Sequence, residues 1–363
     1  MPSDPLVTVH EFAYRGDETG LVLDILNDIR SQIAADEKVL KEAQDRRNLA
    51  AEGGMEIDGA LRWFRSGSVA HGTVNKPVTD ADSGLVLDRR NERYAKLGPD
   101  GEAEGPDEVC DEVAELVGDK VRAKYPKAKV KQTRRGICVE FNEPLNDEED
   151  PSVDLIVTLT RKDEDDLWIP DRDDDSWSAS HPEKHTELFT GDSKELRALR
   201  ARVARLAKAW NKQFDEGDRP LSSFNIVTLA WEYVKGSSVS LDKALAGWFR
   251  YAHDELDNAE TEDPAGVSGP IRLLLDKATV VKRLGSAADR LEHALENEDD
   301  EDAVRDDLAT VFPDYVEPPQ GSKSELASAL RGGKTGVGAS KAGLVVGGGT
   351  ALKKTRPYGV SNA

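Results

Sequence analysis

The chain has 363 residues, of which 38% are hydrophobic and 33% are charged, and its formal net charge is −21. This size allows one large globular domain or two ordinary ones, with enough apolar material for a core. So negative a surface repels other polyanions, which excludes tight non-specific binding to DNA or RNA unless a local basic groove overrides the field.

The sequence carries no signal for a membrane or for an oxidising compartment. No stretch approaches the roughly 20 apolar residues that span a bilayer, and the first residues lack the basic start and apolar run of a signal peptide. Cys110 and Cys138 are too few for a disulfide framework and form no CxxC pair. We therefore expect a cytoplasmic protein without a membrane segment, in which both thiols are buried.

The first half of the chain mixes helical and strand-like patterns. Apolar residues recur at helical spacing from 21 to 49 without an intervening proline, which predicts one long amphipathic helix. A second helix is expected at 107–123. The β-like segments lie at 60–65, 83–87, 130–133, 137–141 and 153–159.

The pattern becomes helical after Pro182. The expected helices are 193–212, 222–234, 241–253, 278–296 and 302–311. From 332 to 363 the chain is rich in glycine and small residues, which predicts a disordered tail because such a segment buries too little to offset its ordering entropy. The predicted fold is therefore α+β: a lobe with a mixed β-sheet at 1–180, a helical lobe at 181–331 and the tail.

Three aspartates are the strongest candidates for catalytic chemistry. Asp80 and Asp82 precede an apolar strand-like run, and residues two apart on a strand point to the same face. Two adjacent carboxylates repel each other unless a cation lies between them, and magnesium prefers such oxygen ligands. Asp154 heads another apolar run and supplies a third carboxylate if the two strands are neighbours. Two metal ions about 3.5–4 Å apart could then stabilise both the attacking and the leaving oxygen of an in-line displacement.

Gly67 and Ser68 fit the same chemistry. Glycine lets the backbone approach a phosphate closely, and a helix that begins there presents free N–H groups to an anion. The hydroxyl of Ser68 would add one more donor.

Other interpretations of these residues stay open at this point. Asp80 could be a turn or cap residue, and Asp154 could be a strand-edge acid paired with Arg134 or Arg135. Gly84 directly follows the aspartate pair and can mark a β-bulge, which leaves the register after Asp82 undecided. We expect the histidines of this region, His71, His181 and His185, at surface or helix-start positions, because their spacing makes a poor zinc site without further ligands.

These motifs resemble the signature of DNA-polymerase-β-type nucleotidyltransferases: Gly67–Ser68, then Asp80 and Asp82, then the later Asp154. Segments 170–189, 205–211 and 221–225 look like the bacterial CD-NTases, the cyclic GMP-AMP synthase-like enzymes of CBASS anti-phage systems. The resemblance covers about residues 20–312. The chain departs from it at Gly84, where the family usually has a larger apolar residue.

The resemblance implies a polymerase-β-like lobe and a helical lobe with nucleotides bound between them. It assigns two Mg²⁺ ions, with Mn²⁺ as a substitute, to Asp80, Asp82 and Asp154. A lysine on one helix and a serine at the start of the next would bind the donor triphosphate, and here these positions match Lys208 and either Ser222 or Ser223. Two simpler interpretations are an exposed helical lysine for Lys208 and a helix N-cap for Ser222.

The implied reaction joins nucleoside triphosphates such as ATP into a cyclic di- or trinucleotide, which activates a separate effector protein during phage infection. In some CBASS systems a ubiquitin-activating-type ligase joins the C-terminal residue of the synthase, here Ala363, to a target. One alternative is a nucleotidyltransferase that modifies an antibiotic, a tRNA end or a protein. Another is a non-catalytic scaffold, although a scaffold has no need for three mutually repelling acids.

Overall fold

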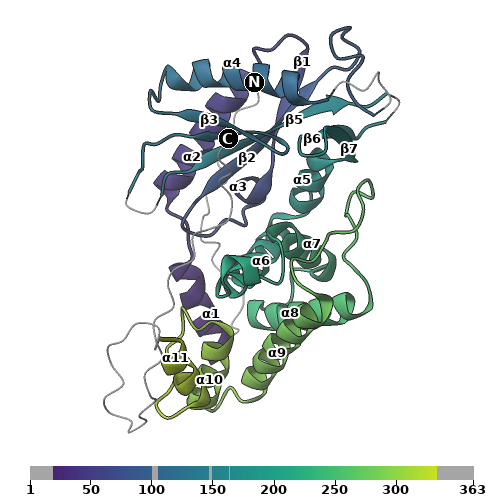
Figure 1. Cartoon of the computed structure of the whole chain (residues 1–363). Coiled ribbons are helices and arrows are strands. Elements are labelled where there is room, and N and C mark those ends of the chain that lie inside the picture. Colours follow the sequence, from purple (N-terminus) through teal and green to yellow (C-terminus); the bar gives the residue numbers. More distant parts are fainter. Residues whose placement is uncertain (1–18, 100–104, 147–148, 163, 333–363) are drawn as a thin grey trace, which may run out of the picture.

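The computed structural model describes residues 19–99, 105–146, 149–162 and 164–332. Within them the chain forms an upper lobe built on a β-sheet and a lower lobe built of helices (Figure 1). Gly332 is the last residue of helix α11 (Lys323–Gly332). The rest of the predicted tail, including Ala363, lies outside the described residues.

The sheet has seven strands and is mixed, as the sequence predicts. Its order is β1–β2–β5–β4–β3, while β6 pairs with β5 and with β7. Strands β2 and β5 run parallel, and every other pair is antiparallel. The strands are β1 (Ala60–Arg65), β2 (Asp80–Leu87), β3 (Lys129–Thr133), β4 (Gly136–Glu140), β5 (Ser152–Thr160), β6 (Leu167–Asp171) and β7 (Ser176–Ser180).

Strands β6 and β7 are not among the segments expected from the sequence. Both are short, β6 contains Pro170, and β7 is mostly serine and alanine, so neither carries a strong strand signal. Pairing with β5 and with each other forms them, and it places them at the margin of the sheet.

One face of the sheet is covered by helices α2 (Glu37–Gly54) and α4 (Asp107–Arg122). Apart from Ser83, the alternate residues of β2 and β5 that point to this face are apolar, and all of them are buried. For example, Leu85 and Leu155 share a core cluster with residues of α4 such as Val113. Because side chains alternate along a strand, the intervening residues of β2 and β5 point to the opposite face.

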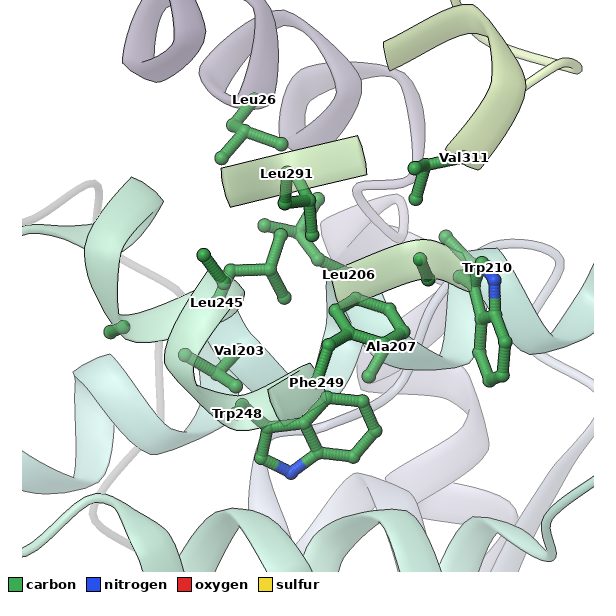
Figure 2. Packing of buried hydrophobic residues seen from close by; sticks show 14 of the residues in the cluster. Leu26, Val203, Leu206, Ala207, Trp210, Leu245, Trp248, Phe249, Leu291 and Val311 are labelled. Carbon is green, nitrogen blue, oxygen red and sulfur yellow. The ribbon is translucent and has the colours of Figure 1, made fainter. Parts of the chain in front are cut away.

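The helical lobe is formed by α6 (Lys194–Lys212), α7 (Ser223–Tyr233), α8 (Leu241–Asn258), α9 (Lys277–Glu296) and α10 (Glu301–Val311), which correspond to the five predicted helices. Figure 2 shows Leu206 and Trp210 of α6 beside Phe249 of α8 in its core. None of the helices in the described part of the chain is long and apolar enough to cross a lipid bilayer.

The prediction of one long N-terminal helix is wrong. The segment forms two helices, α1 (Leu21–Gln32) and α2, and the side chain of Asp36 caps α2 by accepting hydrogen bonds from the backbone N–H groups of Lys38 and Val39. Helix α1 packs into the helical-lobe core, where Leu26 is fully buried, whereas α2 packs on the sheet. Both helices are amphipathic, so periodicity alone did not reveal that the chain crosses between lobes at residues 33–36.

Candidate active site

The three aspartates lie on adjacent strands and share one face of the sheet. Asp80 and Asp82 are two residues apart on β2, and the parallel register pairs Asp82 directly with Asp154 of β5. The residue between the first two, Ala81, points the other way and is buried against Ala43 of α2. The carboxylates therefore occupy the face that α2 and α4 leave uncovered.

Burial and the neighbouring acids disfavour negative charge on Asp80 and Asp82. Burial, followed by the charges of Asp80 and Asp154, raises the pKa of Asp82 to about 7. Burial and then Asp154 also raise the pKa of Asp80. Such a site gains stability when a cation neutralises it.

The donor set fits magnesium, although it does not form a closed cage. Among the described residues, no three His, Cys, Asp or Glu side chains are already gathered tightly enough to enclose a metal ion. Like-charged carboxylates stand apart when no cation lies between them. Magnesium usually takes only one or two carboxylates from the protein and completes its shell with water and substrate phosphate. An open row of oxygen ligands at one face of a sheet suits that coordination.

Gly67 lies directly against Asp82. Its φ is +72°, and a Cβ atom at this position would lie 1.6 Å from Oδ2 of Asp82. The backbone N–H of Ser66 donates to the carbonyl of Asp82 at 3.1 Å. Helix α3 (Gly67–His71) therefore begins beside the aspartate pair, with Ser68 in its first turn. A contact of Gly67 and Ser68 with phosphate remains a prediction.

Lys208 of α6 is buried, with 7% of its surface exposed, so the interpretation of an exposed helical lysine is wrong. Its Nζ donates to the carbonyl and hydroxyl oxygens of Thr73, at 3.3 and 3.1 Å. Burial and then Lys212 lower its pKa to about 8, while the nearby Asp80 and Asp82 act in the opposite direction. The ammonium has three N–H donors, so one remains for a ligand.

The two serines lie at the start of α7. The hydroxyl of Ser222 accepts a hydrogen bond from the N–H of Asn225 at 3.1 Å, which confirms the N-cap interpretation. Ser223 is exposed at the first helical position. Asn211 of α6 holds the preceding residue, Leu221, through two backbone hydrogen bonds of 2.8 and 3.2 Å. A triphosphate contact by either serine remains a prediction.

The open questions about Asp154 and Gly84 have structural answers. Arg134 pairs with Asp171 and Arg135 donates to Ser178, so neither arginine is the partner of Asp154. The pairing of β2 with β5 continues through Gly84 without a bulge.

A Cβ atom on Gly84 would lie 2.0 Å from Cζ of Phe64. The glycine therefore makes room for the Phe64 ring, which packs with Val86 and Leu167.

Two neighbours of the site were not predicted from the sequence. Lys212 lies one turn beyond Lys208, and its pKa is lowered by burial and then by Arg219, while Asp80 acts in the opposite direction. The four-residue spacing from Lys208 was the available signal. Cys138 of β4 pairs in register with Asp154, and burial and then Asp154 raise the pKa of its half-buried thiol to about 12.

The histidine positions only partly agree with expectation. His181 is the N-cap of helix α5 (Pro182–Thr190), as predicted for a helix start. His185 is buried and bonds to Asp263 at 2.5 Å, so it is not a surface residue. His71 contacts Thr186 at 3.1 Å, and burial lowers its pKa to about 3.

Comparison with known proteins adds a family match and a shared fold. Residues 28–192 match the family model described as the Second Messenger Oligonucleotide or Dinucleotide Synthetase domain. Curated protein sequences gave no match.

Solved structures of three bacterial proteins are similar to this chain. CdnC of E. coli MS115-1, solved with HORMA-deltaN, gives a TM-score of 0.61 at 16% identity, covering 81% of this chain and 98% of CdnC. The CD-NTase CdnG of Bradyrhizobium diazoefficiens, solved with GTP, gives a TM-score of 0.58 at 15% identity, covering 85% of this chain and 98% of CdnG. The Vibrio cholerae cyclic AMP-GMP synthase DncV gives a TM-score of 0.52 at 15% identity, covering 84% of this chain and 86% of DncV.

Proposed function

We propose that this chain is a nucleotidyltransferase of the CD-NTase type, which joins nucleoside triphosphates into a cyclic di- or trinucleotide in a magnesium-dependent reaction. The match of residues 28–192 to the synthetase family model and the fold shared with CdnC, CdnG and DncV support this proposal. The observation that carries the proposal is the direct pairing of Asp82 with Asp154, with Asp80 on the same face. Three carboxylates that repel one another on adjacent strands are costly to a fold, and a metal-dependent phosphoryl transfer explains why they stand together.

In this reaction a ribose hydroxyl oxygen forms a bond to the α-phosphorus of a nucleoside triphosphate. The bond from that phosphorus to the departing pyrophosphate breaks, and the hydroxyl loses its proton. Asp80, Asp82 and Asp154 would hold two Mg²⁺ ions, which neutralise phosphate charge and lower the pKa of the attacking hydroxyl. Further rounds of the same reaction close the ring: two rounds in all for a cyclic dinucleotide and three for a cyclic trinucleotide.

The residues around the aspartates have separate tasks in this proposal. Lys208 binds the terminal phosphates through its remaining N–H, and its burial strengthens that charge interaction. The backbone at Gly67 and the hydroxyl of Ser68 approach the same phosphates, and Ser223 supplies a hydroxyl from the start of α7. Ser222 is already engaged as a cap.

We further propose that the cyclic product activates an effector protein in anti-phage defence. CdnC was solved in complex with HORMA-deltaN, and this likeness supports a protein partner as a regulator of this chain too. Activation by a ubiquitin-ligase-like enzyme at Ala363 remains a prediction about residues outside those described. The alternative is that the enzyme transfers the nucleotide to a different acceptor, such as an antibiotic, a tRNA end or a protein. The identity of the reaction product distinguishes the two.

The test is to incubate the protein with labelled nucleoside triphosphates and magnesium, then to treat the reaction with phosphatase and separate the resistant products. We expect a phosphatase-resistant cyclic nucleotide. Label on an added antibiotic, tRNA or protein would favour the alternative, and no product of any kind would contradict catalysis.

The double variant Asp80→Asn/Asp82→Asn should abolish the product while the protein stays folded, because neutral amides bind magnesium weakly. The matched control is Asp88→Asn, just beyond β2, whose carboxylate accepts hydrogen bonds from Arg90. Synthesis by the folded double variant at more than a small fraction of the wild-type rate would contradict the metal assignment.

A further inference from the structure

Arg205 of α6 is a buried cation without an acidic partner. Its side chain is 8% exposed, and no acid among the described residues lies within ion-pairing distance. Its Nε donates instead to Oδ1 of Asn75 at 3.0 Å, and its Nη2 donates to the backbone carbonyl of Ile33 at 3.3 Å. Burying a guanidinium against neutral acceptors is costly, so its place needs a reason.

Asn75 completes a reciprocal pair with this arginine. Its Nδ2 donates to the backbone carbonyl of Arg205 at 2.9 Å, and it is 5% exposed. The next residue, Lys76, donates its N–H to the same Ile33 carbonyl at 3.0 Å. The crossing between α1 and α2, a loop of the sheet lobe and helix α6 of the helical lobe therefore meet at Ile33, Asn75 and Arg205, which we call the interlobe junction.

Each member of the interlobe junction comes from a different part of the fold. Ile33 ends α1 and belongs to the helical-lobe core, at the point where the chain crosses to α2. Asn75 lies in the loop from α3 to β2 of the sheet lobe. Arg205 lies on α6, which Figure 1 shows at the boundary between the two lobes.

The interlobe junction adjoins the ammonium group that faces the aspartates. Lys208 follows Arg205 by one helical turn and bonds to Thr73, two residues before Asn75. The same face of α6 therefore contacts the same loop twice. That loop leads into β2, which begins at Asp80. The loop from Thr73 to Asp80 is thus a short connection between Lys208 and strand β2.

We propose that Asn75 and Arg205 are positioning residues, which fix the distance between Lys208 and the aspartates of β2. This proposal rests on the proposed function, in which Lys208 contacts the phosphates of the nucleotide. Without the reciprocal pair, the direct hydrogen bonds from α6 to this loop are reduced to those of Lys208 with Thr73 among the described residues, so α6 can shift relative to the loop. A shift of about 1 Å in such a contact can cost roughly a hundredfold in rate.

The test compares the binding of a non-hydrolysable nucleoside triphosphate with that of the corresponding monophosphate, by calorimetry. Asn75→Ala and Arg205→Met should each weaken triphosphate binding about tenfold and leave monophosphate binding nearly unchanged. Asn75→Asp retains an acceptor for Nε of Arg205 and should recover most of the affinity.

The matched control is Arg200→Met. Arg200 is another buried arginine of α6, but its bonds to the Val234 carbonyl at 2.8 Å and to Asp192 stay within the helical half of the chain. This variant should leave the difference in affinity between the triphosphate and the monophosphate unchanged.

A double-mutant cycle separates positioning from a general loss of stability. In a Lys208→Ala background, Asn75→Ala should weaken triphosphate binding no further, because its effect acts through the lysine. Additive losses of triphosphate affinity in the double variant would overturn the proposal. So would a loss in Arg200→Met equal to that in Asn75→Ala.

Hydrogen exchange without nucleotide keeps the test independent of the proposed function. Asn75→Ala and Arg205→Met should speed exchange at 33–36 and at 73–78 together, whereas Asn75→Asp and Arg200→Met should not. If the wild-type protein binds no triphosphate, the proposed function fails, and the exchange pattern alone then decides whether the interlobe junction couples these segments. Unchanged hydrogen exchange at 33–36 in Asn75→Ala and Arg205→Met would overturn the proposed coupling.

Discussion

The contact between Gly67 and Asp82 shows how closely backbone and carboxylate share space in the candidate site. Gly67→Ala places a methyl group where Oδ2 of Asp82 lies, 1.6 Å away, at a left-handed φ of +72°. We expect about a hundredfold less product, because the carboxylate must move. The rate of cyclic nucleotide synthesis by the folded variant measures this effect.

Gly72→Ala is the matched control for Gly67→Ala. Its φ is +68°, so it carries the same backbone strain of about 1–2 kcal/mol, but a Cβ atom there meets nothing within 4 Å. Equal losses of activity in the two variants would show that strain, and not displacement of Asp82, limits the reaction.

The raised pKa of Asp82 makes the site unfavourable for the stability of the metal-free protein. Its pKa is about 7 in the folded protein against an ordinary value of 3.8, so the folded state holds the proton more tightly. The stabilising effect of that proton is present at low pH and is lost as the pH rises from about 4 through 7.

Asp82→Asn should therefore raise the free energy of unfolding at pH 8 in EDTA by about 1–4 kcal/mol, with the gain vanishing near pH 4. Urea denaturation at several pH values checks this. Asp88→Asn should show no such gain, because Arg90 lowers the pKa of Asp88. A loss of stability in Asp82→Asn at pH 8 would mean that its carboxylate is already neutralised.

Among the helices, the boundary between α1 and α2 decides which lobe each serves. Asp36 caps α2 at the crossover, with bonds of 2.8 and 3.3 Å to the first backbone N–H groups. Asp36→Ala should lower the free energy of unfolding by about 1 kcal/mol in urea denaturation.

Asp45→Ala is the control for this cap. Asp45 lies on the same helix, and its exposed pair with Lys41 contributes at most about 0.5 kcal/mol. If the two variants lost equal stability, the break between the helices would have to be fixed by packing alone.

The two lobes have separate cores, and the candidate site lies between them. The three aspartates belong to β2 and β5, whereas Lys208 belongs to the helical lobe. In the proposed function a nucleotide bound with magnesium contacts both lobes, so at about 100 times its Kd it should stabilise the folded protein by about 2.7 kcal/mol.

We therefore expect hydrogen exchange to slow at β2, β5, α6 and the start of α7 together when a non-hydrolysable triphosphate and magnesium are added. The Asp80→Asn/Asp82→Asn variant should lose the magnesium-dependent part of this protection. Protection confined to the helices would place the nucleotide elsewhere.

Most of the elements could be predicted because their signals are local. The five helices of the helical lobe have strong apolar periodicity, and four of the predicted strands are rich in β-branched and apolar residues, whereas β3 alternates polar and apolar residues only weakly. The weak strands β6 and β7 could not be predicted, since pairing with a neighbour forms them. The aspartate pair was readable from its two-residue spacing on one strand.

The residue types and their spacing along the chain indicated which groups could do the chemistry: two aspartates on one strand and a third on another. The role of a lysine on a helix came from the resemblance to a known family. The folded arrangement alone settled that β2 and β5 are parallel neighbours in the register that opposes Asp82 and Asp154. It also settled that Lys208 is buried, and that the N-terminal helix is divided between the lobes. Strand pairing, burial and lobe contacts join residues far apart in the sequence, and no local pattern specifies such contacts.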